Sequence, residues 1–424
     1  MKVLIKKKLG GVRKMIGPGI VTGAADDDPS GIVTYSQAGA QTGFGLLWMA
    51  IFTFPLMVVI QEMCARIALV TGKGLAANIK KHFPKYILIP ISLMLVIANT
   101  INIGANLSIM ASVSNHLFPS VPISIWLLLI ALVSVGLEIF ISYKRYAYYL
   151  KWLTLILLSY IATALLVNFD VKELLISTFR PNFSNISDNI LIIAAILGTT
   201  ISPYLFFWQA GEVIEEDVSN GKNAIKQGSQ DGTDRIKVMR KDVWAGMFFS
   251  NLIMYFIIAV CAETLFKNGI TDITSATEAA ESLRPLAGPF AYLLFSLGIV
   301  GTGLLAIPVL AGSSAYALSE TFAWREGLYR KWYQAKLFYA VIFFSVIVGL
   351  LISLIGIDPI KSLIYAAVIN GGVAPFIILI VLLIAGNRQI MGKNANGLVS
   401  NLLGWLLFLV MLGVFGALIF YSLQ

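Results

Sequence analysis

The sequence predicts an all-α integral membrane protein with eleven transmembrane spans, of which the first and the sixth are interrupted near mid-membrane. Three observations support this prediction. The 424 residues are 58% hydrophobic and only 12% charged, whereas soluble domains average about 25% charged residues. Apolar windows of about 20 residues recur along the whole chain. Two of these windows contain a proline among polar and glycine residues, a pattern that breaks a helix.

The apolar windows also give the order of the elements. The eleven predicted spans cover residues 17–40, 44–70, 86–114, 122–142, 148–168, 189–214, 242–264, 288–318, 336–356, 360–385 and 398–422. We assign residues 1–168 to a first group of five helices, 189–385 to a second group and 398–424 to an eleventh helix. The connecting loops are too short for a separate soluble domain, so we expect one unit.

The net charge of +9 comes from Lys and Arg residues that lie mostly in the short loops, where they set the orientation of the chain. If the N-terminus is cytoplasmic, the inner loops carry 25 of these residues and the outer loops carry 5. Positive residues concentrate on the cytoplasmic side of membrane proteins. We therefore expect a bacterial plasma-membrane protein with its N-terminus inside and its C-terminus outside. Its partner is the lipid bilayer, and no nucleic acid is expected.

The sequence carries no motif typical of an enzyme or of a cofactor site. It has no glycine-rich phosphate loop, no Ser/His/Asp constellation and no zinc-ligand spacing. Cys64 and Cys261 both lie in apolar spans, which indicates neither a disulfide framework nor a metal cluster. We expect no catalytic residues and no cofactor, and the sequence does not indicate an oligomeric state.

The first span has three consecutive carboxylates, Asp26, Asp27 and Asp28, at its centre. On insertion scales a carboxylate at bilayer depth costs about 2.5–3.5 kcal/mol, so such residues are rare and functional. Pro29 lacks an N–H group and Gly31 accepts almost any backbone angle, so the helix is expected to break here. A broken membrane helix exposes unpaired backbone groups, which are tolerated only where they line a cavity. Carboxylates beside free carbonyls therefore predict a cation site.

The sixth span repeats this pattern, with Gly198, Thr199, Thr200, Ser202 and Pro203 at its centre. The breaks lie in the first and the sixth span, five spans apart. Because five is an odd number, the second half is inserted upside down relative to the first. Interrupted segments at matching positions of two inverted halves are typical of a transporter with its substrate site between them. The free carbonyls at the end of each half-helix favour a cation.

These two segments resemble the Nramp family of divalent-metal transporters, which have the leucine-transporter-type fold of two inverted five-helix repeats. The family's first helix carries GPG, then a DPGN motif, then QAGA. The corresponding residues here are 17–19, 28–31 and 37–40, with further similarity at 69–73, 115–122 and 390–392. The resemblance covers nearly the whole chain. It implies alternating access to a site between helices 1 and 6.

The family's metal ligands are only partly kept. They are the Asp and Asn of DPGN together with a carbonyl and a Met sulfur in helix 6. By this resemblance Asp28 takes the Asp position, and Gly31 takes the Asn position without a coordinating side chain. Thr199 takes the carbonyl position and Ser202 the Met position, while Asp27 is an additional carboxylate. The resemblance implies a metal site formed by these five residues.

The loss of the thioether changes the ion that is expected. Sulfur ligands favour soft transition metals, whereas oxygen ligands suit Mg²⁺, Ca²⁺ and Mn²⁺. Mg²⁺ keeps several waters and is held by one or two carboxylates. Gly31 and Ser202 are expected to leave room for those waters, so we expect hydrated Mg²⁺, or Mn²⁺, as the transported ion. The sequence looks most like the Nramp-related magnesium transporter branch. The alternative is a degenerate site that has lost transport.

The residues that serve proton coupling in the family are also changed. Members that couple to protons carry a histidine just after the helix-6 proline and acidic residues in helix 3. The matching residues here are Tyr204 and Gln209 in the sixth span, and Ile103 and Asn106 in the third. Without a titratable relay we expect uniport. The residues assigned to the pathway or a gate are Tyr204, Asn106, Gln209, Thr200 and Asp26.

Three alternative functions stay open from the sequence. A proton-coupled Mn²⁺ or Fe²⁺ importer would use the aspartates as its titratable groups. A Na⁺-coupled organic-solute symporter on the same fold would need a free helix-1 backbone for a substrate carboxylate, which three aspartates match poorly. A non-transporting sensor would need a soluble output domain, for which the sequence shows no segment.

Overall fold

The structure is a computed structural model, and it describes residues 17–141, 143–181, 186–225, 229–271, 273 and 276–422. Within these ranges every regular element is a helix, as predicted. The basic segment 1–16, which contributes to the predicted orientation, lies outside the described residues.

The helices of the described chain fall into long apolar ones and short connecting ones. The α-helices are α2 (Pro18–Asp26), α3 (Pro29–Thr42), α4 (Trp48–Thr71), α5 (Leu75–His82), α6 (Lys85–Leu117), α7 (Ile123–Phe140), α8 (Tyr143–Leu153), α9 (Leu158–Ala164), α10 (Val171–Phe179), α11 (Ile186–Thr200), α12 (Pro203–Ser219), α13 (Gln230–Thr264), α14 (Ala276–Phe322), α15 (Lys336–Leu354), α16 (Pro359–Gly386), α17 (Arg388–Met391) and α18 (Leu398–Ser422). The 3-10 helices are η1 (Gly43–Leu46), η2 (Thr154–Leu157), η3 (Phe266–Asn268) and η4 (Gly392–Asn394).

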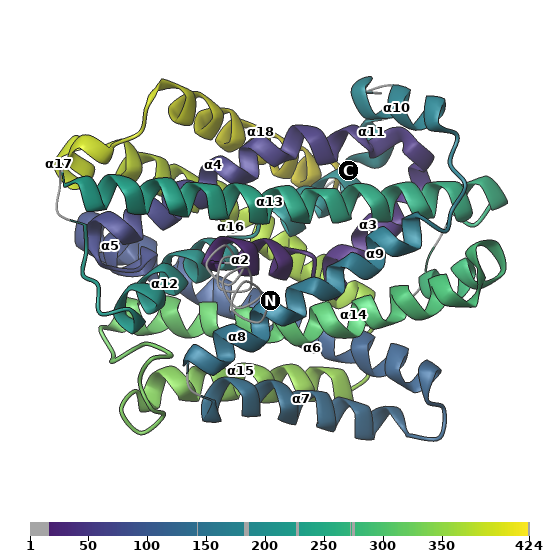
Figure 1. The fold of residues 1–424 in the computed structure, drawn as a ribbon, viewed down its shortest axis with the longest axis horizontal. Coiled ribbons are helices and arrows are strands. Elements are labelled where there is room, and N and C mark those ends of the chain that lie inside the picture. Colours follow the sequence, from purple (N-terminus) through teal and green to yellow (C-terminus); the bar gives the residue numbers. More distant parts are fainter. Residues whose placement is uncertain are drawn as a thin grey trace, which may run out of the picture.

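The predicted spans correspond to these helices one by one. Among the described residues, ten helices are long and apolar enough to cross a membrane, with α11 and α12 counted together as one span. The pair α2 and α3 supplies the eleventh, because each half alone is too short. Long helices such as α13 and α14 run along the longest axis of the molecule, with α5 and α17 at one end and α10 at the other (Figure 1). The chain is an integral membrane protein.

Both predicted interruptions are present, and a proline follows each one. The first span stops at Asp26 and resumes at Pro29, and the sixth stops at Thr200 and resumes at Pro203. Proline fits the first position of a helix, where its missing N–H group is not needed, but it cannot continue the helix before it. Each break therefore sets a helix C-terminus beside a helix N-terminus in the middle of the bundle.

The half-helix α2 packs backbone to backbone against α13, as their neighbouring ribbons in Figure 1 show. A Cβ atom built on Gly23 would collide with the carbonyl of Gly246, and one built on Gly246 would collide with the carbonyl of Gly19. Only glycine allows two helices to approach this closely. The contact fixes α2 against α13 and so positions the first break.

The long helix α6 lies against α14, α15, α16 and the start of the second half-helix α3. Asn102 and Asn106 of α6 reach the first break at Asp28. The grouping of the spans into two repeats with the boundaries given above stays a prediction.

We predict that Gly246→Ala lowers the stability of the folded protein by about 1–3 kcal/mol, the usual cost of adding a methyl group to a packed site. The added methyl group would force α13 away from the carbonyl of Gly19. Thermal unfolding of the purified protein in detergent, followed by tryptophan fluorescence, measures the change.

The matched control is Gly413→Ala in α18, where a new Cβ meets nothing within 4 Å. Alanine favours a helix over glycine by up to about 1 kcal/mol, so this variant is expected to be as stable as the wild type or more stable. Equal melting temperatures for the two variants would contradict the close α2–α13 contact.

Candidate metal site

Asp28 is the cap of the second half-helix, α3. Its Oδ1 accepts hydrogen bonds from the backbone N–H of Gly31, at 2.8 Å, and from the hydroxyl of Ser30. Pro29, which follows Asp28, occupies the first position of the helix. A carboxylate at a helix N-terminus satisfies free N–H groups and interacts favourably with the helix dipole. The sequence Asp-Pro-Ser-Gly therefore both breaks the span and fixes a carboxylate at the break.

The other oxygen of Asp28 is held from α6. Its Oδ2 accepts hydrogen bonds from Nδ2 of Asn106 at 3.0 Å and from Nδ2 of Asn102 at 3.3 Å. Both asparagines are buried, and the Oδ1 atom of each has no hydrogen-bond partner among the described residues. The amide groups thus satisfy the carboxylate while their own oxygens stay available. A cation at Asp28 would take the place of these amide donors.

The two preceding aspartates face other surroundings. Asp26 accepts a hydrogen bond from the hydroxyl of Ser250 in α13, at 2.7 Å to Oδ2, and its Oδ1 has no partner. Asp27, between the two half-helices, is fully buried and has no hydrogen-bond partner at either carboxylate oxygen. Neither residue lines the small cavity that lies between the two interrupted spans and is described below. Only Asp28 is linked to that cavity by hydrogen bonds.

In the part of the chain that the structure describes, the three carboxylates have no cationic partner. No ion pair between described residues includes any of them. An isolated buried charge costs many kcal/mol unless it is paired, hydrogen-bonded or neutralised. The break therefore requires a bound cation or a proton for charge balance.

A small cavity of about 20 Å³ lies between the two interrupted spans. This volume suits about one water molecule. The cavity is lined by residues of α3, α6, α11, α12 and α16 and of the second break, namely Ser30, Thr34, Asn102, Gly198, Thr199, Ser202, Tyr204, Leu363, Ala366, Ala367 and Asn370. The partners Ser30 and Asn102 connect Asp28 to this lining.

Two of the predicted ligands in the sixth span, Thr199 and Ser202, line the cavity. The Ser202 hydroxyl donates to the carbonyl oxygens of Gly198 at 2.6 Å and Thr199 at 2.9 Å. A carbonyl oxygen has a second lone pair, so the Thr199 carbonyl can still accept from water. Thr200 instead donates its hydroxyl to Ile196 of its own helix, at 2.8 Å, and does not line the cavity.

The remaining predicted residues differ in their positions. Tyr204 lines the cavity and donates its hydroxyl to the carbonyl of Ala25 at 3.1 Å, which joins the two interrupted spans. Gln209 is buried further along α12, outside the cavity lining. Gly31 is also outside it. A Cβ there would lie 3.1 Å from the Thr199 methyl group, so neighbouring chain takes up much of the room expected for waters.

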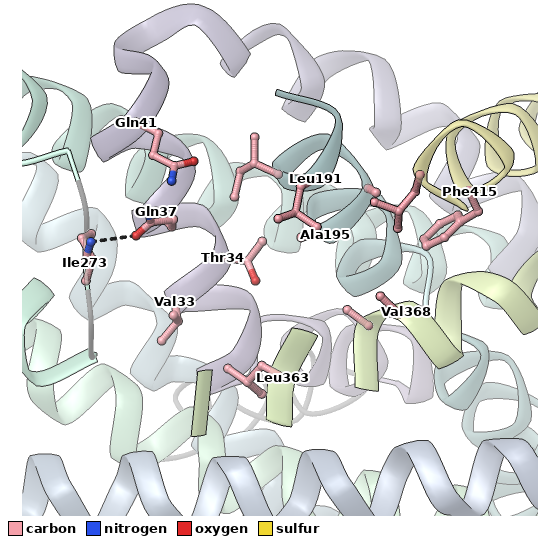
Figure 2. A pocket seen from close by; sticks show the side chains of 14 residues that line it. Val33, Thr34, Gln37, Gln41, Leu191, Ala195, Ile273, Leu363, Val368 and Phe415 are labelled. Carbon is pink, nitrogen blue, oxygen red and sulfur yellow. Dashed lines mark hydrogen bonds between the residues drawn. The ribbon is translucent and has the colours of Figure 1, made fainter. Parts of the chain in front are cut away.

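A wider vestibule of about 330 Å³ leads toward the cavity (Figure 2). Thr34, Gln37 and Gln41 of α3 face it, and Leu191 and Ala195 of α11 form the opposite wall (Figure 2). The vestibule and the cavity share three lining residues, Thr34, Leu363 and Ala367. The two spaces therefore adjoin at these three residues.

The opposite end of the molecule is held together by charged groups. The carboxylate of Asp242 in α13 accepts the backbone N–H groups of Gly17 at 2.7 Å and Gly19 at 2.6 Å, where α2 begins. Glu62 in α4 is paired with Arg66 at 2.9 Å and with Arg240 of α13 at 2.8 Å. The Asp242 contacts bind the start of the first span to α13, and the Glu62–Arg240 pair joins α4 to α13.

Sequence reasoning missed part of the lining. Ser30, Asn102 and Asn370 are polar residues of the cavity wall that were not among the predicted site residues. Asn102 had a usable signal, because it lies four residues before Asn106 and therefore on the same face of α6. Asn370 had only the signal of a polar residue in an apolar span, which indicates packing between helices as readily as a position on the pathway.

Comparison with known proteins identifies relatives along nearly the whole chain. The model of the family described as natural resistance-associated macrophage protein-like (Nramp) matches residues 19–421. The divalent metal cation transporter MntH of Bacillus subtilis is 24% identical over 419 residues, covering 96% of this chain and 92% of the relative. MntH of Klebsiella pneumoniae is 25% identical over 421 residues, covering 96% and 94%.

Solved structures agree with the fold. The manganese transporter of Eremococcus coleocola, in complex with an aromatic bis-isothiourea compound, superposes with a TM-score of 0.73 at 15% identity. The match covers 94% of this chain and 84% of that one. Mhp1, a nucleobase-cation-symport-1 family transporter, gives a TM-score of 0.60 at 15% identity and covers 96% and 92%. The fold is of the leucine-transporter type.

We predict that Asn106→Ala lowers the stability of the folded protein by about 1–3 kcal/mol, because Oδ2 of Asp28 loses its shorter amide donor inside the bundle. Thr100→Ala in the same helix removes only a hydroxyl that bonds its own helix, at Val96, and serves as the control. Thermal unfolding in the absence of divalent ions compares the two variants. The same melting temperature for both would show that Asn106 does not hold the carboxylate.

Proposed function

Because this chain belongs to the Nramp family, we propose that it is a divalent metal cation transporter in which Mg²⁺ passes between the two interrupted spans. The observation that carries this proposal is the set of three buried carboxylates at the helix break, which lie next to a cavity and have no cationic partner among the described residues. The relatives reported above are named as metal transporters and not as enzymes.

The ligand atoms around the cavity favour the binding of a hard ion. The groups that it offers are hydroxyl, amide and backbone oxygens, with the Asp28 carboxylate one hydrogen bond away. Among the described residues that line the cavity there is no Met, Cys or His. Oxygen ligands of this kind suit Mg²⁺, Ca²⁺ and Mn²⁺. In our proposal Asp28 balances the ion, and Thr199 and Ser202 hold its waters.

The small volume of the cavity limits how many waters a bound ion can keep. Mg²⁺ gives up its waters reluctantly and usually keeps several. A cavity of about 20 Å³ has room for about one water, so a largely hydrated ion needs the site to widen. Thr34, Leu363 and Ala367 separate the cavity from the vestibule, and their displacement would join the two spaces.

The transport cycle that we propose alternates between the two ends of the bundle. With the N-terminus in the cytoplasm, the vestibule beside α3 opens outward, and the ion pair of Glu62 in α4 with Arg240 in α13 closes the inner side. The ion would enter through the vestibule, bind at the break and leave after the inner contacts separate. We propose that movement is down the gradient, since Tyr204, Asn106 and Gln209 provide no histidine or carboxylate for a proton.

A second candidate function is a proton-coupled Mn²⁺ importer. It is favoured by the similarity to the manganese transporter of Eremococcus coleocola. It would need Asp26 or Asp27 as the proton carrier, because these are the acidic groups nearest to Asp28. Acidification of the vesicle interior during Mn²⁺ uptake would distinguish it from uniport.

We predict that Asp28→Asn reduces Mg²⁺ uptake into liposomes at least tenfold. The substitution keeps the size and the helix cap but removes the charge that balances the ion. Uptake is measured with a Mg²⁺-sensitive dye inside the vesicles at fixed protein density.

The control is Asp170→Asn. Asp170 is exposed and caps α10, so this variant removes a carboxylate from a helix cap outside the proposed site. Its uptake is expected to equal that of the wild type. If Asp28→Asn also transports at the wild-type rate, Asp28 is not an ion ligand and the proposal fails.

We further predict that Ser202→Met raises the ratio of Mn²⁺ to Mg²⁺ uptake several-fold. A thioether in the cavity wall is a soft ligand, and it favours a transition metal over Mg²⁺. Uptake of each ion is measured separately in the same preparation.

Ser202→Leu provides the control, since leucine fills a similar volume without sulfur. It is expected to reduce both rates together. A Mn²⁺ to Mg²⁺ ratio that rises equally in the leucine variant would mean that bulk, rather than sulfur, sets the preference.

A further inference from the structure

Asn102 of α6 both bonds the carboxylate at the break and forms part of the cavity wall. Its Nδ2 donates to Oδ2 of Asp28 at 3.3 Å, and the residue lines the cavity between the two interrupted spans. Among the described residues, only Ser30 shares this double position. Asn102 is 5% exposed, and no described residue bonds its Oδ1. Buried oxygens are normally satisfied, so this one is available to a group that enters the cavity.

Asn106, one turn further along α6, provides a comparison within the same helix. Its Nδ2 donates to the same oxygen of Asp28 at 3.0 Å, and its Oδ1 likewise has no partner in the described part of the chain. Asn106 is fully buried and does not line the cavity. Two amides of the same chemistry therefore bond one carboxylate oxygen, and only that of Asn102 borders the space that an ion would enter.

Several hydroxyl groups of the cavity wall already donate within the protein. Tyr204 donates to the carbonyl of Ala25, and Thr34 donates to the carbonyl of Ser30 at 2.9 Å. The Ser202 hydroxyl donates to two carbonyl groups beside the second break. An asparagine amide differs from these groups, because it carries a donor and an acceptor at opposite sides of one plane. A rotation of the amide can therefore exchange the one for the other.

A half-turn about the Cβ–Cγ bond would exchange the nitrogen and the oxygen of Asn102. Torsions of this type have broad, roughly two-fold preferences, and the two atoms are of similar size, so the rotation needs little additional room. Without an ion, Nδ2 has to face Asp28, because an ionised carboxylate only accepts hydrogen bonds. With a cation beside Asp28, the oxygen is the atom that is attracted to this place.

The distance between the two side chains suits two ligands of one ion. After the half-turn, Oδ1 of Asn102 would take the place of Nδ2, about 3.3 Å from Oδ2 of Asp28. Two neighbouring oxygens of an octahedral Mg²⁺ site, each about 2.1 Å from the ion, lie about 3.0 Å apart. The cavity of about 20 Å³ has room for about one water. An oxygen supplied by the wall would replace a water for which there is little room.

We propose that Oδ1 of Asn102 is a ligand of the transported ion, which it reaches by a half-turn that moves the amide nitrogen away from Asp28. This inference rests on the proposed function. Asparagine carbonyl oxygens are hard ligands of divalent cations. The ion is then held from α3 by Asp28 and from α6 by Asn102. The same amide is a hydrogen-bond donor when the site is empty and a ligand when it is filled.

The test compares Asn102→Leu with Asn106→Leu, since leucine has nearly the shape of asparagine without a donor or an acceptor. Binding of Mg²⁺ to the purified full-length protein in detergent is measured by isothermal titration calorimetry at neutral pH. Asn102→Leu is expected to weaken binding at least tenfold, because it removes a ligand. Asn106→Leu removes only a donor to Asp28 and is expected to weaken binding a few-fold. Thermal unfolding verifies that both variants are folded.

A spectroscopic measurement separates ligation from the loss of a donor. The protein is made with isotope-labelled asparagine, and infrared difference spectra are recorded with and without Mg²⁺. An amide carbonyl band is expected to move to lower frequency on binding, because coordination weakens the C=O bond. This shift is expected to be absent in Asn102→Leu and present in Asn106→Leu.

Two results would overturn the inference. If Asn102 is only a donor to Asp28, Asn102→Leu loses no more affinity than Asn106→Leu, whose bond is the shorter one. The other result is a carbonyl band that does not move, or that still moves in Asn102→Leu. The proposed function fails separately, if the wild type binds no Mg²⁺ or if Asp28→Asn binds it as tightly as the wild type.

Discussion

The hydrogen bonds of one carboxylate hold the centre of this protein together. Asp28 caps α3 through Gly31 and Ser30 and accepts the amides of Asn102 and Asn106 from α6. A helix interrupted inside a membrane would otherwise leave N–H groups unpaired in a medium without water. The cap makes the break tolerable, and the contact with α6 fixes the break in the bundle. The negative charge that does this is also what a cation would recognise.

Amide groups have a particular advantage as partners of such a charge. An asparagine donates through its nitrogen and accepts through its oxygen, so it can neighbour a carboxylate alone or a carboxylate with its ion. Arginine or lysine at the same positions would neutralise Asp28 permanently and compete with the ion. The unpartnered oxygens of Asn102 and Asn106 agree with a site that has to exist in two states.

The spans and both interruptions could be predicted from the sequence, because span length and proline act locally. The resemblance of the first span also pointed to Asp28, and the chain does belong to that family. The surroundings of each aspartate could not be predicted. Whether Asp26 meets Ser250 depends on how α2 lies on α13, which is 224 residues away in the chain. Such contacts depend on how distant helices pack, and periodicity carries no information about that.

The glycine contact between α2 and α13 limits how the inner side can open. Backbones that touch without side chains between them have no soft layer in which to slide or tilt. A half-helix packed in this way moves together with its neighbour as one rigid body. The pivot is then displaced from the proline break toward the loops that connect α13 to the rest of the chain, and the speed of opening would depend on those loops.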